Sequence, residues 1–155
     1  MKKILLACLL TFSAWAAETN VYKVSYNVGV EKTLENMLKQ FKAEGLLVVW
    51  QLDILAEFKE RGLDKKLGED FNRPKLDAVR TMIVCNGMLG NAIVNADADM
   101  MAYCPVRITL TEKDGVTTIL YVRPSSAPRD SKAYPALLKL ENKVTKAIEA
   151  SMEME

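Results

Sequence analysis

Residues 106–123, VRITLTEKDGVTTILYVR, decide how this sequence is expected to fold. Apolar and polar side chains alternate through Val106–Glu112 and again through Val116–Arg123, as is typical of strands with one buried face. Asp114 and Gly115 stand between the two runs, and an Asp-Gly pair in that position is a strong signal for a tight hairpin turn. The stretch therefore predicts two neighbouring antiparallel strands late in the chain.

The same patterns define the rest of the chain. Strands are predicted over residues 21–28, 46–54 and 78–85. Helices are predicted over residues 30–44, 55–61, 87–96 and 131–155, and a charged loop over 63–74. The strand at 46–54 is apolar enough for a central place in a sheet, so Trp50 within it is expected to lie in the core.

Five strands and about four helices in this order predict an α+β fold. We expect a single two-layer sandwich, with an about five-stranded, mostly antiparallel sheet and helices packed on one face. The C-terminal helix at 131–155 is amphipathic and is expected to pack on the same domain. The other face of the sheet is then free to be covered by a second copy, which makes a homodimer a candidate assembly.

The N-terminus has the three parts of a secretory signal. Lys2 and Lys3 precede an apolar run from Ile4 to Phe12, and Ala14 with Ala16 fits the small residues at a cleavage site. We expect a signal peptide over residues 1–16, cleaved after Ala16 or Ala17, and a soluble protein exported to the periplasm or secreted. Without Lys2 and Lys3 the net charge of +1 becomes −1.

Composition excludes several classes of function. The chain of 155 residues contains no histidine, which rules out Ser-His-Asp and Cys-His catalysis and the usual zinc sites. Its near-zero net charge gives no sign of nucleic-acid binding, and after signal removal no membrane partner is expected. Neither a catalytic residue nor a cofactor is identified, and the enzyme question stays open, with a non-enzymatic role favoured.

Two cysteines carry the only concentrated chemistry in the mature chain. Cys85 is predicted at the end of a strand and the start of a helix, where backbone N–H groups and the helix dipole favour a thiolate. Asn86 is a suitable N-cap residue. Cys104 precedes the hairpin, and Tyr103 beside it could line a pocket. Candidate ligand-binding residues are therefore Cys85, Asn86, Tyr103 and Cys104.

Four interpretations of the cysteine pair remain open. An exported protein favours a Cys85–Cys104 disulfide; the thiols could instead be two buried small hydrophobes. A redox-cycling pair is the third interpretation, although no C-x-x-C motif is present. The fourth is a soft-metal or haem site, with Met88 and Met101 joining the cysteines as metal ligands because thiolates and thioethers select Cu(I).

Several motifs resemble domain-of-unknown-function family 302. They are TLENMLKQFKAEG at Thr33–Gly45, Asp53 at the end of the next strand, Lys66-Leu67-Gly68, the Cys85-Asn86 step, and Cys104 before the hairpin. The likeness runs over residues 21–124, with Gly87 and Pro105 departing from the proline positions usual in the family. The resemblance implies a small α+β domain of an exported bacterial protein, dimeric, with no agreed activity.

The function expected from these observations is a binding or accessory module. Its site would be centred on the cysteines and would hold a small ligand, a soft metal or haem. The alternatives are a thiol-redox accessory protein that uses Cys85 and Cys104, and a purely structural domain with one disulfide.

Overall fold

The computed structural model describes residues 20–154 as one antiparallel sheet with helices. The predicted signal peptide lies outside the described residues. The strands are β1 (Val21–Tyr26), β2 (Leu47–Asp53), β3 (Ala78–Cys85), β4 (Val106–Lys113) and β5 (Val116–Val122). The α-helices are α1 (Val30–Ala43), α2 (Ile54–Glu60), α3 (Leu63–Leu67), α4 (Gly87–Ala96) and α5 (Tyr134–Met152), with 3-10 turns η1 (Gly68–Asp70), η2 (Ala98–Tyr103) and η3 (Pro124–Ser126). The predicted α+β fold is confirmed.

The predicted hairpin is the centre of the sheet. Strand order is β1-β5-β4-β3-β2, and every neighbouring pair is antiparallel. The connection between β4 and β5 is Asp114-Gly115, with φ of 52° and 75°. Two consecutive positive φ angles are the signature of a type I′ turn, whose twist matches that of the flanking strands. Asp77 Oδ2 accepts a hydrogen bond of 2.8 Å from the Asp114 amide and so braces the turn.

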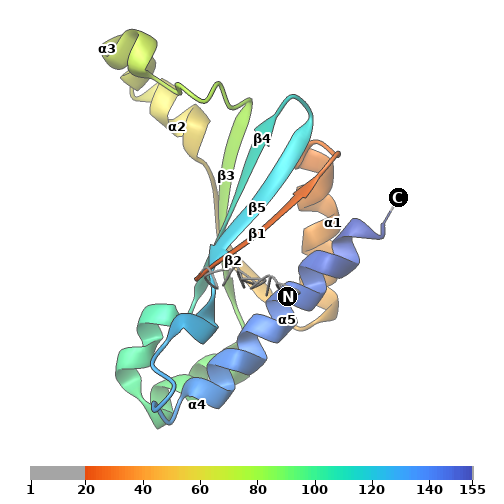
Figure 1. The fold of residues 1–155 in the computed structure, drawn as a ribbon, viewed down its shortest axis with the longest axis vertical. Coiled ribbons are helices and arrows are strands. Elements are labelled where there is room, and N and C mark those ends of the chain that lie inside the picture. Colours follow the sequence, from red (N-terminus) through yellow and green to blue (C-terminus); the bar gives the residue numbers. More distant parts are fainter. Residues whose placement is uncertain (1–19, 155) are drawn as a thin grey trace, which may run out of the picture.

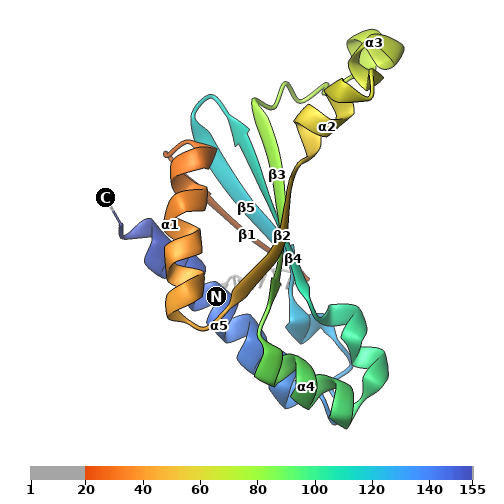
Figure 2. The same cartoon turned by 180° about the vertical axis from the view of Figure 1, so that it is seen from behind.

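One face of the sheet is covered by α1 and α5, which also pack on each other (Figures 1 and 2). The core lies between these helices and the inward-facing residues of the central strands. Its largest fully buried side chains include Phe41, Met82, Ile108, Ile119, Leu140 and Ile148. Burying aliphatic and aromatic area at roughly 25 cal/mol per Å² is the main stabilising term for such a layer.

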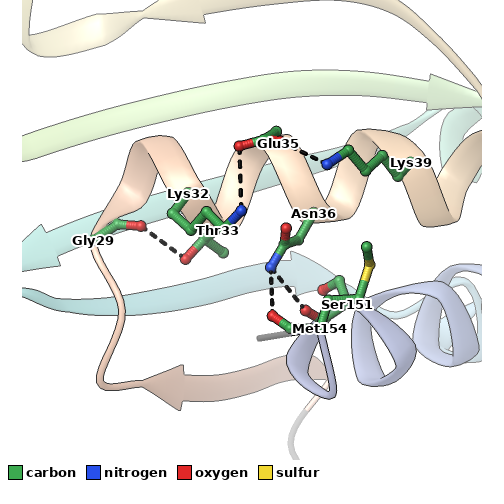
Figure 3. A network of polar contacts seen from close by, with 8 residues as sticks. All are labelled: Gly29, Lys32, Thr33, Glu35, Asn36, Lys39, Ser151 and Met154. Atoms are coloured by element: carbon green, nitrogen blue, oxygen red, sulfur yellow. Dashed lines mark hydrogen bonds and ion pairs between the residues drawn. The ribbon is translucent and has the colours of Figure 1, made fainter.

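A polar contact joins the two covering helices at one end (Figure 3). Asn36 lies on the buried side of α1, and its Nδ2 donates to the Met154 carbonyl at 3.0 Å and to the Ser151 carbonyl at 3.4 Å. These carbonyls belong to the last turn of α5 and the residues after it, where no intrahelical donor remains. Asn36 therefore ties the C-terminal end of α5 to α1.

The prediction that residues 46–54 form a central strand is wrong. β2 is an edge strand, paired only with β3 among the described strands, and Trp50 is 50% exposed rather than in the core. Leu47 and Val49 are exposed as well. The apolar composition that suggested burial between two strands instead leaves apolar side chains along an open edge.

The prediction of a loop over 63–74 is also corrected. Residues Leu63–Leu67 form α3, which begins after Gly62 in the left-handed conformation at φ 70°. Together α2 and α3 form an arm that projects past one end of the sheet, while α4 lies at the opposite end (Figures 1 and 2). Within the described residues, no helix is both long enough and apolar enough to cross a membrane.

Candidate functional site

The site predicted from the cysteines lies where β3 passes into α4. Asn86 caps this helix, because its Oδ1 accepts from the Leu89 amide at 3.0 Å. Its Nδ2 donates to the Gly45 carbonyl at 2.8 Å, which joins the helix start to the turn before β2. Both the oxygen and the nitrogen of the Asn86 side-chain amide are therefore occupied by hydrogen bonds, and Asn86 positions the start of α4.

Cys85 and Cys104 are brought together, as free thiols. A Cβ atom placed on Gly90 would lie 3.8 Å from each sulfur, so both thiols pack against the same backbone position of α4. Cys104 is 1% exposed and Cys85 is partly buried. The two thiols thus lie near each other, a placement that the sequence left open, and no disulfide joins them in this structure.

The two thiols differ in chemical environment. Burial is the main cause that raises the pKa of Cys104 to about 11, and the neighbouring Cys85 thiol raises that pKa further through electrostatic and hydrogen-bonding interaction. A buried thiol with this pKa stays protonated at neutral pH. Cys85, which is more accessible, is then the member of the pair that an external reagent reaches first.

The predicted methionine ligands do not join the thiols. Met88 is 86% exposed, because it stands about 200° around α4 from Gly90, the residue that faces the sulfurs. Met101 in η2 is 37% exposed. Among the described residues there is no group of three or more Cys, Asp or Glu side chains arranged to hold a metal ion.

Tyr103 lines a hollow of about 510 Å³ on the face of the sheet opposite α1 and α5. Outward-facing residues of the central strands form its sheet side, including Arg107, Thr109 and Leu120. Ala102, Tyr103 and Pro105 bound it on the side of η2. In the segment Tyr103-Cys104-Pro105, the first and last residues thus line the pocket, and the thiol of the central residue is buried.

Three residues of the hollow, Arg107, Thr109 and Leu120, are not among the site residues predicted from the sequence. Alternation in VRITL does place Arg107 and Thr109 on the same face of a strand, which was the available signal. The sequence does not specify the register in which the strands pair. Pairing of Thr109 with Leu120, and of Val122 with Val21, brings three strands together under the hollow.

Two of the smaller hollows among the described residues lie elsewhere. One of about 230 Å³ lies beside Arg80, which forms ion pairs with Asp53 and Glu31. The other, of about 270 Å³, is apolar and lies under the arm, where Phe58 and Phe71 face Val79 of β3.

Comparison with known proteins places the chain in a family. The model of the family described as "Domain of unknown function DUF302" matches residues 22–153. The chain belongs to the DUF302 family. The resemblance carried by Thr33–Gly45 and the Cys85-Asn86 step is confirmed, and the match continues past residue 124 to include α5.

The fold is similar to that of a solved structure with the same family designation. It is the uncharacterized conserved protein DUF302 from Bacillus stearothermophilus, with a TM-score of 0.71 and 20% sequence identity. The similarity covers 84% of this DUF302 chain and 96% of that one. At this identity the likeness shows the shared fold. No curated protein matches the chain.

Proposed function

We propose that this DUF302 chain is a binding module whose site is the hollow bordered by Tyr103. The observation that carries the proposal is a pocket of about 510 Å³ on the face left free by the helices. Small-molecule sites typically occupy about 300–1,000 Å³ and combine an apolar lining with a few polar groups. Leu120, Val122 and Pro105 supply the apolar lining here, and Arg107 and Thr109 supply polar groups.

The pocket and the predicted site segment support each other. Tyr103, which the sequence favours as a site residue because it adjoins Cys104, borders the pocket. Its phenol combines an apolar ring with one hydroxyl group, a combination suited to contact with a partly apolar ligand. Cys104 follows Tyr103 in this wall, Cys85 packs beside Cys104 against Gly90, and Asn86 caps the helix that carries Gly90, so we assign these three residues to the support of the site.

A neutral aromatic probe tests this proposal. We expect N-phenyl-1-naphthylamine to bind the mature protein with enhanced fluorescence, because its rings match an apolar pocket. Leu120→Trp should fill the pocket and weaken binding at least tenfold. Phe58→Gln alters an exposed apolar residue on the arm, away from the pocket, and serves as the control. It should leave the affinity for the probe unchanged. Binding that survives Leu120→Trp and disappears in Phe58→Gln would contradict the proposal.

The thiol pair supports a second candidate function, reversible thiol oxidation. In this reaction the Cys85 thiolate attacks one sulfur of a disulfide oxidant and releases the first thiol of that oxidant. Cys104 then gives up its proton and attacks the Cys85 sulfur, which forms the Cys85–Cys104 disulfide and releases the second thiol. Two electrons and two protons pass to the oxidant. Packing of both sulfurs against Gly90 is the observation that favours this candidate.

We further propose that the protein acts outside the cytoplasm as a homodimer. Export rests on the signal sequence, with cleavage after Ala16 or Ala17. For the dimer, β2 leaves an open edge with exposed Leu47 and Trp50, and Phe58 of the arm is 42% exposed. Antiparallel pairing of two β2 edges around a two-fold axis would cover both edges at once. Sedimentation should give twice the monomer mass, and Trp50→Lys should shift it to monomer; a monomeric wild-type protein would refute the dimer.

A further inference from the structure

The charged side chains of the strands are distributed unevenly between the two faces of the sheet. Only two acidic residues lie within the strands, Asp53 and Glu112, and both are directed to the helix-covered side. Asp53 pairs with Arg80 there, and Glu112 accepts a hydrogen bond of 2.9 Å from the Val30 amide at the start of α1. The strand positions on the uncovered face therefore include no carboxylate.

Cations, in contrast, occur on the uncovered face. Lys23 of β1 and Arg107 and Lys113 of β4 are exposed and alternate with inward-facing neighbours. The pairing of Lys23 with Leu120 places Lys23 beside the pocket, whereas Lys113 lies at the hairpin end of β4, away from the residues that line the pocket. This face has a local positive charge in a chain whose total charge is close to zero.

Arg107 differs from Arg80 in β3 and from Arg123, which follows β5, because those two arginines form ion pairs within the fold. Arg80 is paired with two carboxylates, and Arg123 contacts Glu141 at 2.9 Å. Arg107 lines the pocket and forms no ion pair with any described residue. Its five N–H donors are therefore available to an incoming acceptor, and a guanidinium is suited to paired contacts with carboxylate, sulfonate or phosphate oxygens.

The same pocket offers apolar surface next to this cation. Leu120, Val122 and Pro105 form an apolar area, and the Thr109 hydroxyl adds one more polar group near Arg107. A free inorganic anion would use only the polar groups of Arg107 and Thr109 and would leave the apolar lining in water. A ligand with an apolar body and one anionic group uses both parts of the pocket.

We propose that the pocket takes an amphipathic organic anion, an aryl or alkyl body with one acidic group, and that Arg107 binds the acidic group. This inference rests on the proposed function and specifies its ligand class. Lys23 contributes a second, more distant positive charge that attracts the anion. Because the contact lies at an open surface, salt should weaken it.

Two probes with one skeleton test the proposal. 8-Anilino-1-naphthalenesulfonate differs from N-phenyl-1-naphthylamine by one sulfonate group, so a comparison of their dissociation constants isolates the effect of the charge. In wild-type protein we expect the sulfonate to bind about tenfold more tightly at low salt, with the difference shrinking at high salt. Arg107→Gln should remove this preference and leave binding of the neutral probe unchanged. Lys113→Gln, on the same face and outside the pocket, should retain the preference.

The outcomes separate this inference from the proposed function. If both probes bind equally well and Leu120→Trp removes both, the pocket is a binding site and the anion proposal is overturned. If the preference for the sulfonate survives Arg107→Gln, the role of Arg107 is overturned. If neither probe binds wild-type protein, the proposed function and the ligand class both fail.

Discussion

The sulfurs of Cys85 and Cys104 lie at the same distance, 3.8 Å, from the position that a Cβ atom would take on Gly90. Two thiols from the end of one strand and the approach to the next therefore share one packing site against α4. The Cys104 backbone continues directly into Pro105 and β4, and Tyr103 before it borders the pocket. Packing at Gly90 thus supports one wall of the proposed binding site.

The first prediction concerns the size of residue 90. Gly90→Ala should be neutral or stabilise the protein by up to about 1 kcal/mol, because alanine favours the helix and 3.8 Å is an ordinary contact. Gly90→Leu should destabilise it by roughly 1–3 kcal/mol, because the larger side chain must displace both sulfurs. Urea unfolding of the two variants measures the difference. Equal stability of both variants would show that the thiols do not pack closely here.

The second prediction concerns thiol reactivity. Iodoacetamide should modify Cys85 first, and Cys104 should react only after unfolding, because Cys104 is buried and its pKa is raised to about 11. Mass spectrometry of peptides after timed alkylation identifies the modified residue. Cys85→Ser serves as the matched control and should leave a native protein with almost no reactive thiol. Rapid labelling of Cys104 in that variant is the result that would count against this assignment.

The third prediction is a loss of stability in alkali. An unfolded cysteine titrates near its ordinary pKa of 9.0, whereas Cys104 in the folded protein titrates near 11, so the folded state holds the proton more tightly. The free energy of unfolding should therefore fall as pH rises from about 9 to 11. Cys104→Val should show a smaller fall over this interval. Buried Tyr121, whose pKa is raised to about 12, adds a similar loss at higher pH in both proteins.

The fourth prediction concerns the tie between α1 and α5. Asn36→Ala should cost about 1–2 kcal/mol, because the carbonyls of Ser151 and Met154 lose a buried donor. Asn36→Asp should cost more at neutral pH, since a buried carboxylate would face those two carbonyls without a donor. Its excess cost should shrink as pH falls and the carboxylate takes up a proton. Identical unfolding curves for the two variants at pH 7 would contradict this account of Figure 3.

The fifth prediction concerns a buried ion pair near the C-terminal helix. Glu141 is 7% exposed and accepts from Arg123 at 2.9 Å and from the Ser125 amide at 2.7 Å. Glu141→Ala should destabilise the protein by about 2–4 kcal/mol, because a partly buried guanidinium and an amide both lose their acceptor. Glu141→Gln keeps an acceptor and should cost less. Thermal unfolding of both variants gives the comparison.

The sequence predicted the fold better than it predicted the site. The hairpin was predictable because Asp114 and Gly115 tolerate the positive φ angles that a type I′ turn requires. The place of β2 was not, because an apolar edge and a buried centre have the same composition. Trp50 shows the ambiguity: a residue suited to a core is half-exposed at an edge.

The site was predictable only in part for a related reason. Residue type and position in the chain predicted Cys85, Cys104 and Tyr103 as site residues. They lie in, or next to, one wall of the pocket. Arg107 and Leu120 belong to the pocket through strand pairing, which the sequence of a single strand does not specify. Helical spacing explains Met88, since a residue two positions from Gly90 faces away from it.

Locating the bound probe shows whether the hollow beside Tyr103 binds a small molecule. Backbone amide signals of the ¹⁵N-labelled protein should be recorded by NMR during titration with N-phenyl-1-naphthylamine. We expect saturable shifts concentrated at Tyr103, Arg107, Thr109 and Leu120. Shifts confined to the arm over residues 54–67, or no saturable shifts at all, would contradict binding in this hollow.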